Sequence, residues 1–196
     1  MSAYTIALFL HVTGVVGLFM ALGVEMTCAI ALRGARRVEQ VRVLSGLMVG
    51  VERLFPISIL LLLGAGLYMA ITVWGFQTAW IDVALGSLLI IAPTAPLVNG
   101  PRAHAIKREA EAAADGPLTA ALRARVSDPV LTMSHSILLV VTLGIVFLMT
   151  NKPQLVTSLA TILIALALGI GLGTALRRAE RRRLASANVA ASAREG

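Results

Sequence analysis

The amino-acid sequence predicts an all-α protein, a polytopic bundle of five transmembrane helices with its N-terminus outside and its C-terminus in the cytoplasm. Composition is the first reason: 58% of the 196 residues are hydrophobic and only 14% are charged, whereas about a quarter of a soluble domain is charged. The second reason is that the apolar residues form runs long enough for a helix to cross a bilayer core, which takes about 20 residues. The third is that basic residues gather in every second connection between these runs. Transmembrane barrel strands are excluded, because they alternate apolar and polar residues over about 10 positions.

The positions of the apolar runs predict spans at about 4–32, 54–76, 80–98, 129–150 and 154–176. The first span is long enough to tilt or to continue as a helix beyond the membrane. In the third span, Pro93 and Pro96 are expected to kink the inner end. We expect a single membrane domain over residues 1–183. The small, polar residues of 184–196 predict a disordered cytoplasmic tail.

Short sequence motifs predict where the later helices begin and end and how one of them packs. The stretch "AIKREAEAAA" predicts a helix in the loop 101–128, broken by "DGP" at 115–117. Asp128 is expected to be the N-cap of the fourth span, with Pro129 at its first helical position. Gly169 and Gly173 form a small-xxx-small pair, which lets helix backbones approach closely. This pair predicts packing within the monomer, with a homodimer face as the alternative.

The distribution of basic residues predicts the orientation. Of the 17 Lys and Arg residues, only Lys152 falls in the two short connections, "GFQTAW" and "TNKPQ". Excess Lys and Arg mark the cytoplasmic side of a membrane protein. We therefore expect a multi-pass membrane protein that attracts anionic lipid at its cytoplasmic face. Nucleic acid is not an expected partner, because no aromatic residues interleave with the arginines.

Ionisable residues inside the spans are the candidate functional groups, because charged side chains are costly in a bilayer and usually face a bundle interior. His11 and Glu25 lie on nearly the same face of the first span but ~21 Å apart along its axis. His11 shares the outer depth with Asp82, its expected partner. Glu25 shares the inner depth with Arg53 and His135. We expect Glu25 to contact Arg53, His135 or both, and an ion pair with Arg53 is favoured over a role in substrate binding.

Two stretches resemble a group of small bacterial membrane proteins. The segment "LFLHVTGVVGLF" at 8–19 is similar to the first helix of copper-resistance D-type proteins and of HemJ-type protoporphyrinogen oxidases. The segment "LGIVFLMTNKP" at 143–153 resembles a related family of integral membrane proteins of unknown function. The resemblance covers about residues 4–153 and implies a location in a bacterial inner membrane. It implies that His11, the only residue that matches the motif position, is associated with haem or copper.

Function is less constrained than fold. No Gly-rich phosphate loop, nucleophile elbow or HExxH motif occurs. One hypothesis is a membrane protein that binds haem b or a copper ion through His11, because imidazole is a common haem ligand and also binds copper. The alternatives are a non-catalytic membrane component and a small transporter or proton-relay protein. The sequence leaves open whether the protein is an enzyme.

Overall fold

The computed structural model describes residues 2–195, with the side chains of residues 180, 183–185 and 187–195 left out. Within these residues the chain is helical and contains no strand. Within the described part of the chain, five helices are long and apolar enough to cross a membrane, and each predicted span overlaps one of them: Ala3–Gly34, Val38–Trp74, Ala79–Ala112, Ala120–Asn151 and Leu155–Ala179. The predicted all-α fold with five helices of membrane-spanning length and composition is therefore confirmed.

The long helices are subdivided by changes of helical geometry. In chain order the elements are α1 (Ala3–Gly34), α2 (Val38–Val51), α3 (Leu54–Met69), η1 (Ala70–Trp74), α4 (Ala79–Ile91), η2 (Ala95–Asn99), α5 (Gly100–Ala112), α6 (Ala120–Val126), α7 (Pro129–Asn151) and α8 (Leu155–Glu195). The short elements η1 and η2 are π-helices, which often occur at functional sites. Pro93 and Pro96 flank the start of η2, where the expected kink is a change from α- to π-helix.

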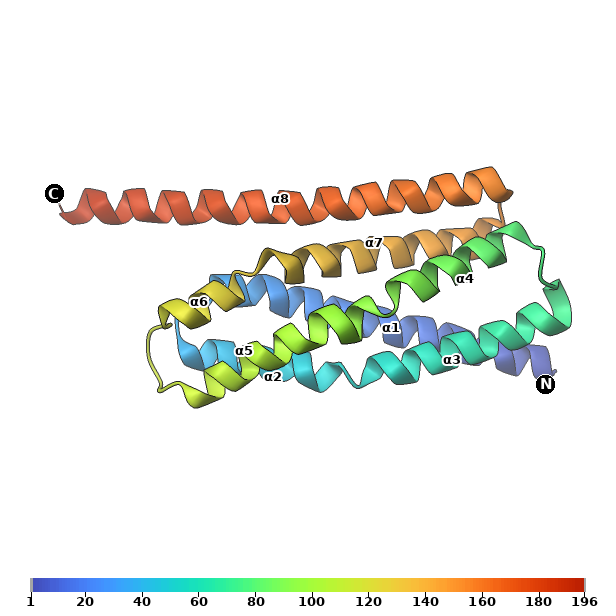
Figure 1. Ribbon diagram of the computed structural model, residues 1–196, viewed down its shortest axis with the longest axis horizontal. Helices are drawn as coiled ribbons and strands as arrows, with labels where there is room; N and C mark the ends of the chain where they lie inside the picture. The colour runs from blue at the N-terminus through green and yellow to red at the C-terminus, as the bar shows by residue number, and fades with distance from the viewer. Residues whose placement is uncertain (1, 196) are drawn as a thin grey trace.

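The bundle has two unlike ends (Figure 1). The start of α1, η1 and the α7–α8 connection form one end, which we call the pocket end. The helices α2, α5 and α6 gather at the other, which we call the basic end. Helix α7 lies at the centre and packs against α1, α4, η2 and α8. Helix α8 continues beyond the rest of the bundle at the basic end (Figure 1).

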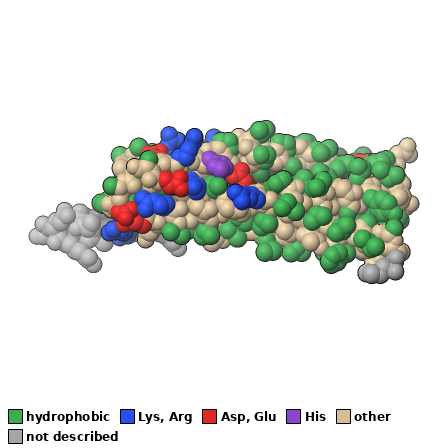
Figure 2. All heavy atoms as spheres, turned by 90° about the horizontal axis from the view of Figure 1, so that it is seen from below, with side chains coloured by type: hydrophobic (Ala, Val, Ile, Leu, Met, Phe, Trp, Pro, Cys, Tyr) green, Lys and Arg blue, Asp and Glu red, His purple; other side chains and the backbone are tan. Residues whose placement is uncertain are grey.

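Charged side chains concentrate at the basic end, whereas the rest of the visible surface is mostly apolar (Figure 2). Ion pairs connect the helices there, including Arg42 to Asp115 at 2.9 Å and Arg102 to Asp128 at 3.1 Å. Beneath these pairs the end of α1 and helices α2, α5 and α6 share an apolar core. The basic end is thus built like a small water-soluble helical bundle.

The contact between α7 and α8 depends on residues without side chains. A Cβ atom on Gly169 would lie 2.8 Å from the Cα of Ile137, and one on Gly173 would lie 2.7 Å from the sulfur of Met133. The small-xxx-small pair therefore packs within the monomer, as expected. Asp128 caps α7 by accepting a 2.8 Å hydrogen bond from the backbone N–H of Val130, which confirms the predicted helix start.

Two features differ from or lie beyond the sequence predictions. Residues 38–51 form the helix α2, whereas the sequence predicted only a connection between the first two spans. Tertiary burial of Val38, Val41 and Met48 where α2 packs against α1 and α5 explains why this segment is ordered. The backbone of α8 is helical to Glu195. The expected disorder of 184–196 stays a prediction, because most of the side chains of that segment lie outside the described residues.

Candidate functional site

The position of His11 depends on close contact between α1 and α3. Gly14, one turn after His11, packs against the α3 backbone so tightly that a Cβ there would lie 2.7 Å from Leu62 N and Ser58 O. A Cβ on Gly66 would in turn lie 3.0 Å from two atoms of the His11 ring. The two glycines therefore open a space on the α3 backbone in which the imidazole fits.

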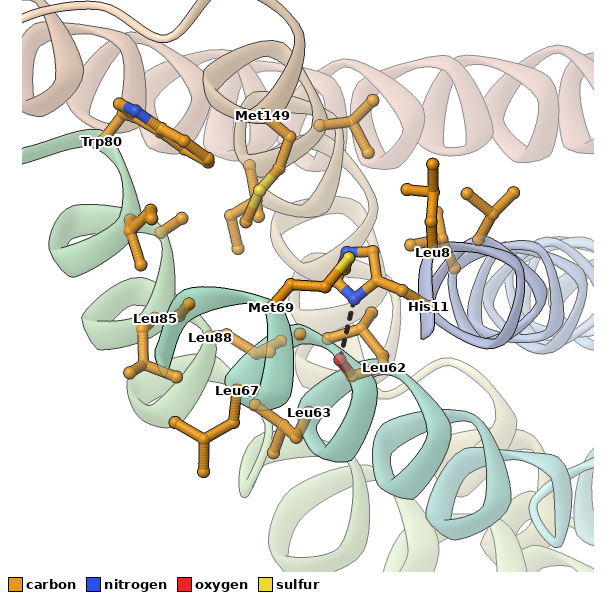
Figure 3. A pocket seen from close by; sticks show the side chains of 18 of the residues that line it. Leu8, His11, Leu62, Leu63, Leu67, Met69, Trp80, Leu85, Leu88 and Met149 are labelled. Atoms are coloured by element: carbon orange, nitrogen blue, oxygen red, sulfur yellow. Dashed lines mark hydrogen bonds between the residues drawn. The ribbon is translucent and has the colours of Figure 1, made fainter. Parts of the chain in front are cut away.

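Within this space His11 hydrogen-bonds to the backbone of α3. Its Nδ1 lies 2.8 Å from the carbonyl oxygen of Leu62 (Figure 3). A carbonyl oxygen can only accept, so Nδ1 carries the proton and donates it. In the neutral ring, Nε2 then keeps an unshared lone pair. An Nδ1–H bonded to a backbone carbonyl is a common way to orient a histidine that ligates a metal through Nε2.

His11 lines a pocket of about 490 Å³ between α1, α3, η1, α4 and α7. Most of the wall is aliphatic, and it also includes the sulfur atoms of Met69 and Met149 (Figure 3). Trp74, Trp80 and Lys152 also line the pocket: Trp74 and Lys152 are exposed and form its rim, whereas Trp80 is buried. The Trp74 and Trp80 rings make an edge-to-face contact with centroids 5.5 Å apart. The volume falls within the range of pockets that hold small organic ligands or cofactors, about 300–1,000 Å³.

Asp82 is not the partner of His11. It lies exposed in the first turn of α4, and no hydrogen bond or ion pair joins it to His11 within the described residues. The sequence argument placed the two side chains at one depth but did not include backbone acceptors. The Leu62 carbonyl satisfies the imidazole instead.

The second predicted group forms a buried contact between α1 and α7. Glu25 Oε2 lies 2.7 Å from His135 Nε2, and the two side chains are 6% and 0% exposed. His135 Nδ1 lies 2.6 Å from the carbonyl oxygen of Leu131, one turn earlier in α7, and so must donate to it. The Glu25–His135 contact therefore contains one proton, shared between a carboxyl group and an imidazole. In either arrangement of that proton the pair has no net charge, which limits the cost of its burial.

Asn99 and Ser134 complete this buried cluster. Asn99 lies in η2, and its amide nitrogen is 3.5 Å from His135 Nε2. Its amide oxygen accepts a hydrogen bond from the Ser134 hydroxyl. The π-helical segment η2 thus contains Asn99, the polar side chain that reaches the contact between α1 and α7. We call Glu25, Asn99, Ser134 and His135 the inner cluster.

Arg53 is not part of the inner cluster. It is exposed, and no ion pair joins it to Glu25 within the described part of the chain. The favoured Glu25–Arg53 pairing is therefore replaced by the Glu25–His135 pairing, the other alternative that shared depth predicted. An apolar layer that includes Leu18, Leu22 and Phe55 packs between the inner cluster and the pocket. The two predicted groups are thus separate sites, as their spacing along α1 indicated.

Sequence reasoning did not identify several residues of these sites. Met69 and Met149 carry no charge or motif, and methionine in a span is ordinarily packing. Asn99 follows the proline pair of the third span, which is the one sequence signal for an irregular, functional segment there. Within the described residues, no group of three or more His, Cys, Asp or Glu side chains could hold a metal ion. A metal at His11 would therefore need a cofactor or sulfur ligands.

Comparisons with protein-family models, with curated proteins and with solved structures found no match to this chain. The functional argument therefore depends on the geometry of the pocket and of the inner cluster.

Proposed function

We propose that the protein binds haem b in the membrane, with His11 Nε2 as the axial ligand. The observation that carries the proposal is the hydrogen bond from His11 Nδ1 to the Leu62 carbonyl, which fixes the ring while leaving Nε2 uncommitted. No described residue hydrogen-bonds to Nε2. This imidazole has the features of a proximal haem ligand: one nitrogen is hydrogen-bonded, the other is free, and the ring lies next to an apolar pocket.

The size and lining of the pocket fit haem better than a bare metal ion. A pocket of about 490 Å³ with aliphatic walls is far larger than one ion needs. Bound haem would supply redox chemistry, and the protein's own contribution would be orientation of the ligand and exclusion of water. The resemblance of residues 8–19 to haem- and copper-associated membrane proteins agrees with this proposal.

The topology proposal is that the pocket end faces outside and the basic end faces the cytoplasm of a bacterial inner membrane. The supporting observation is that Lys152 is alone among the 17 Lys and Arg residues in the connections of the pocket end. A reporter fused after Gly196 is expected to be active only in the cytoplasm. Periplasmic activity of that fusion would reverse the proposed orientation.

The visible absorption spectrum of the purified, haem-reconstituted protein tests the haem proposal. We expect the wild type to show a Soret band with a stoichiometry of one haem per chain. The variant His11→Ala should insert and fold, as judged by circular dichroism, but lose the band. His104→Ala is the matched control, because His104 lies exposed at the basic end next to Glu52. A colourless wild type, or a Soret band that survives in His11→Ala, would contradict the proposal.

Binding of Cu(I) is the second candidate, because Met69 and Met149 line the same pocket as His11. Thioether sulfur and imidazole nitrogen are suitable ligands for Cu(I). Competition with a chromophoric Cu(I) chelator separates the two candidates. Withdrawal of one copper per chain by the wild type, but not by Met69→Leu or His11→Ala, would favour copper. Without copper or haem binding, the non-catalytic component and the transporter remain.

A further inference from the structure

Among the described residues, Lys152 is the one cation that lines the pocket. Lys152 is the C-cap of α7, where its left-handed backbone (φ 52°) and a hydrogen bond from its N–H to the Leu148 carbonyl fix the turn into α8. Its ammonium lies 4.1 Å from the centroid of the Trp74 ring. Both residues line the pocket. The cation is therefore held at the rim by an aromatic face.

Among the side chains that the structure describes, no carboxylate forms an ion pair with this cation. Asp82 is the acidic residue of the same end, and no ion pair joins it to Lys152 within the described residues. A contact with an aromatic face leaves the three N–H donors of an ammonium available to an acceptor. The pocket thus has a free imidazole nitrogen within its apolar wall and an unpaired ammonium at its rim.

We propose that the occupant of the pocket is an anionic amphiphile, whose apolar body fills the cavity and whose carboxylate pairs with Lys152 at the rim. This inference rests on the proposed function, since a haem propionate is such a carboxylate. Charge complementarity selects the ligand class: neutral apolar molecules would fill the same walls but would leave the ammonium without a partner. Lys152 is thereby a specificity-determining residue, separate from the ligating role of His11.

Metal-free protoporphyrin tests the inference independently of His11, because it has the two propionates but no iron to ligate. The protein is reconstituted in nanodiscs of phosphatidylcholine, which has no net charge. Binding is measured as quenching of the fluorescence of Trp74 and Trp80, which are the two tryptophans of the chain and both line the pocket. Each protein is titrated with the free acid and with its dimethyl ester, so that the ratio of the two dissociation constants cancels differences in fluorescence between variants.

We expect the wild type to prefer the free acid to the ester by about fivefold, the upper range for an ion pair at an exposed site. Lys152→Gln should abolish the preference, and Lys152→Arg should retain it. Lys107→Gln, at the basic end, is the matched control and should leave it unchanged. Equal affinities of acid and ester for the wild type, or an unchanged preference in Lys152→Gln, would overturn the inference.

The same titrations with ferric haem and its dimethyl ester separate this inference from the proposed function. A Soret band that depends on His11, without preference for the acid, would overturn the inference and leave haem binding in place. A preference for the acid that depends on Lys152, without a Soret band that depends on His11, would overturn haem ligation alone. Absence of quenching by every porphyrin would overturn both.

Discussion

Truncation of either partner of the buried Glu25–His135 contact should destabilise the bundle strongly. In Glu25→Ala, His135 Nε2 would keep only its 3.5 Å contact with the Asn99 amide, at the limit of hydrogen bonding. Breaking a buried pair by removing one partner costs about 3–5 kcal/mol. Because the pair has no net charge, we expect the lower end of this range, about 3 kcal/mol, for each single variant.

A double-mutant cycle isolates the contact itself. Glu25→Ala combined with His135→Ala should cost about 4 kcal/mol, less than the two single costs added together, because no partner is left unsatisfied in the double variant. The difference, about 2 kcal/mol, is the expected coupling energy and lies within the range for directly contacting residues. Glu25→Gln should cost at most about 1 kcal/mol, since its amide can still donate to Nε2.

Reversible unfolding by titration with a denaturing detergent, followed by circular dichroism, measures these free energies. Thr27→Ala is the matched control, because Thr27 is exposed on the same helix and its hydroxyl bonds only within α1, to the Gly23 carbonyl. It should change stability by no more than about 0.5 kcal/mol. Additivity of the two single variants to within about 0.5 kcal/mol would refute the direct contact.

Three further substitutions test the packing of α8, the position of the His11 imidazole and the start of α7. Gly169→Ala should destabilise the bundle by about 1–3 kcal/mol through backbone contact with α7, whereas Gly171→Ala, with nothing within 4 Å of its Cβ, should be neutral or stabilising in the same unfolding assay. Gly66→Ala should lower haem affinity at least tenfold by displacing the imidazole, and Gly64→Ala, which also meets open space, should leave the haem titration unchanged. Asp128→Ala should cost about 1 kcal/mol of unfolding free energy by removing the cap; no measurable loss would contradict its capping role.

The sequence by itself determined the features that depend on local composition. Runs of apolar residues defined the spans, because a bilayer of fixed thickness requires a fixed length of helix. Asp128 and Pro129 marked the start of α7, because capping involves neighbours along the chain. The rise per residue gave depth, and depth brought Glu25 and His135 together as one of two alternatives.

Only the tertiary structure decided which groups at one depth meet. Helix α3 and the first part of α8, residues 155–176, are apolar around their whole circumference, so periodicity does not fix their rotation about their own axes. The packing of α3 and α7 against α1 placed His135, and not Arg53, next to Glu25. It also set His11 against the Leu62 carbonyl, and a backbone acceptor has no signature in a sequence because every residue supplies one. The pocket, with its free imidazole nitrogen and a lysine that forms no ion pair among the described residues, exists only because α1, α3, η1, α4 and α7 pack around it.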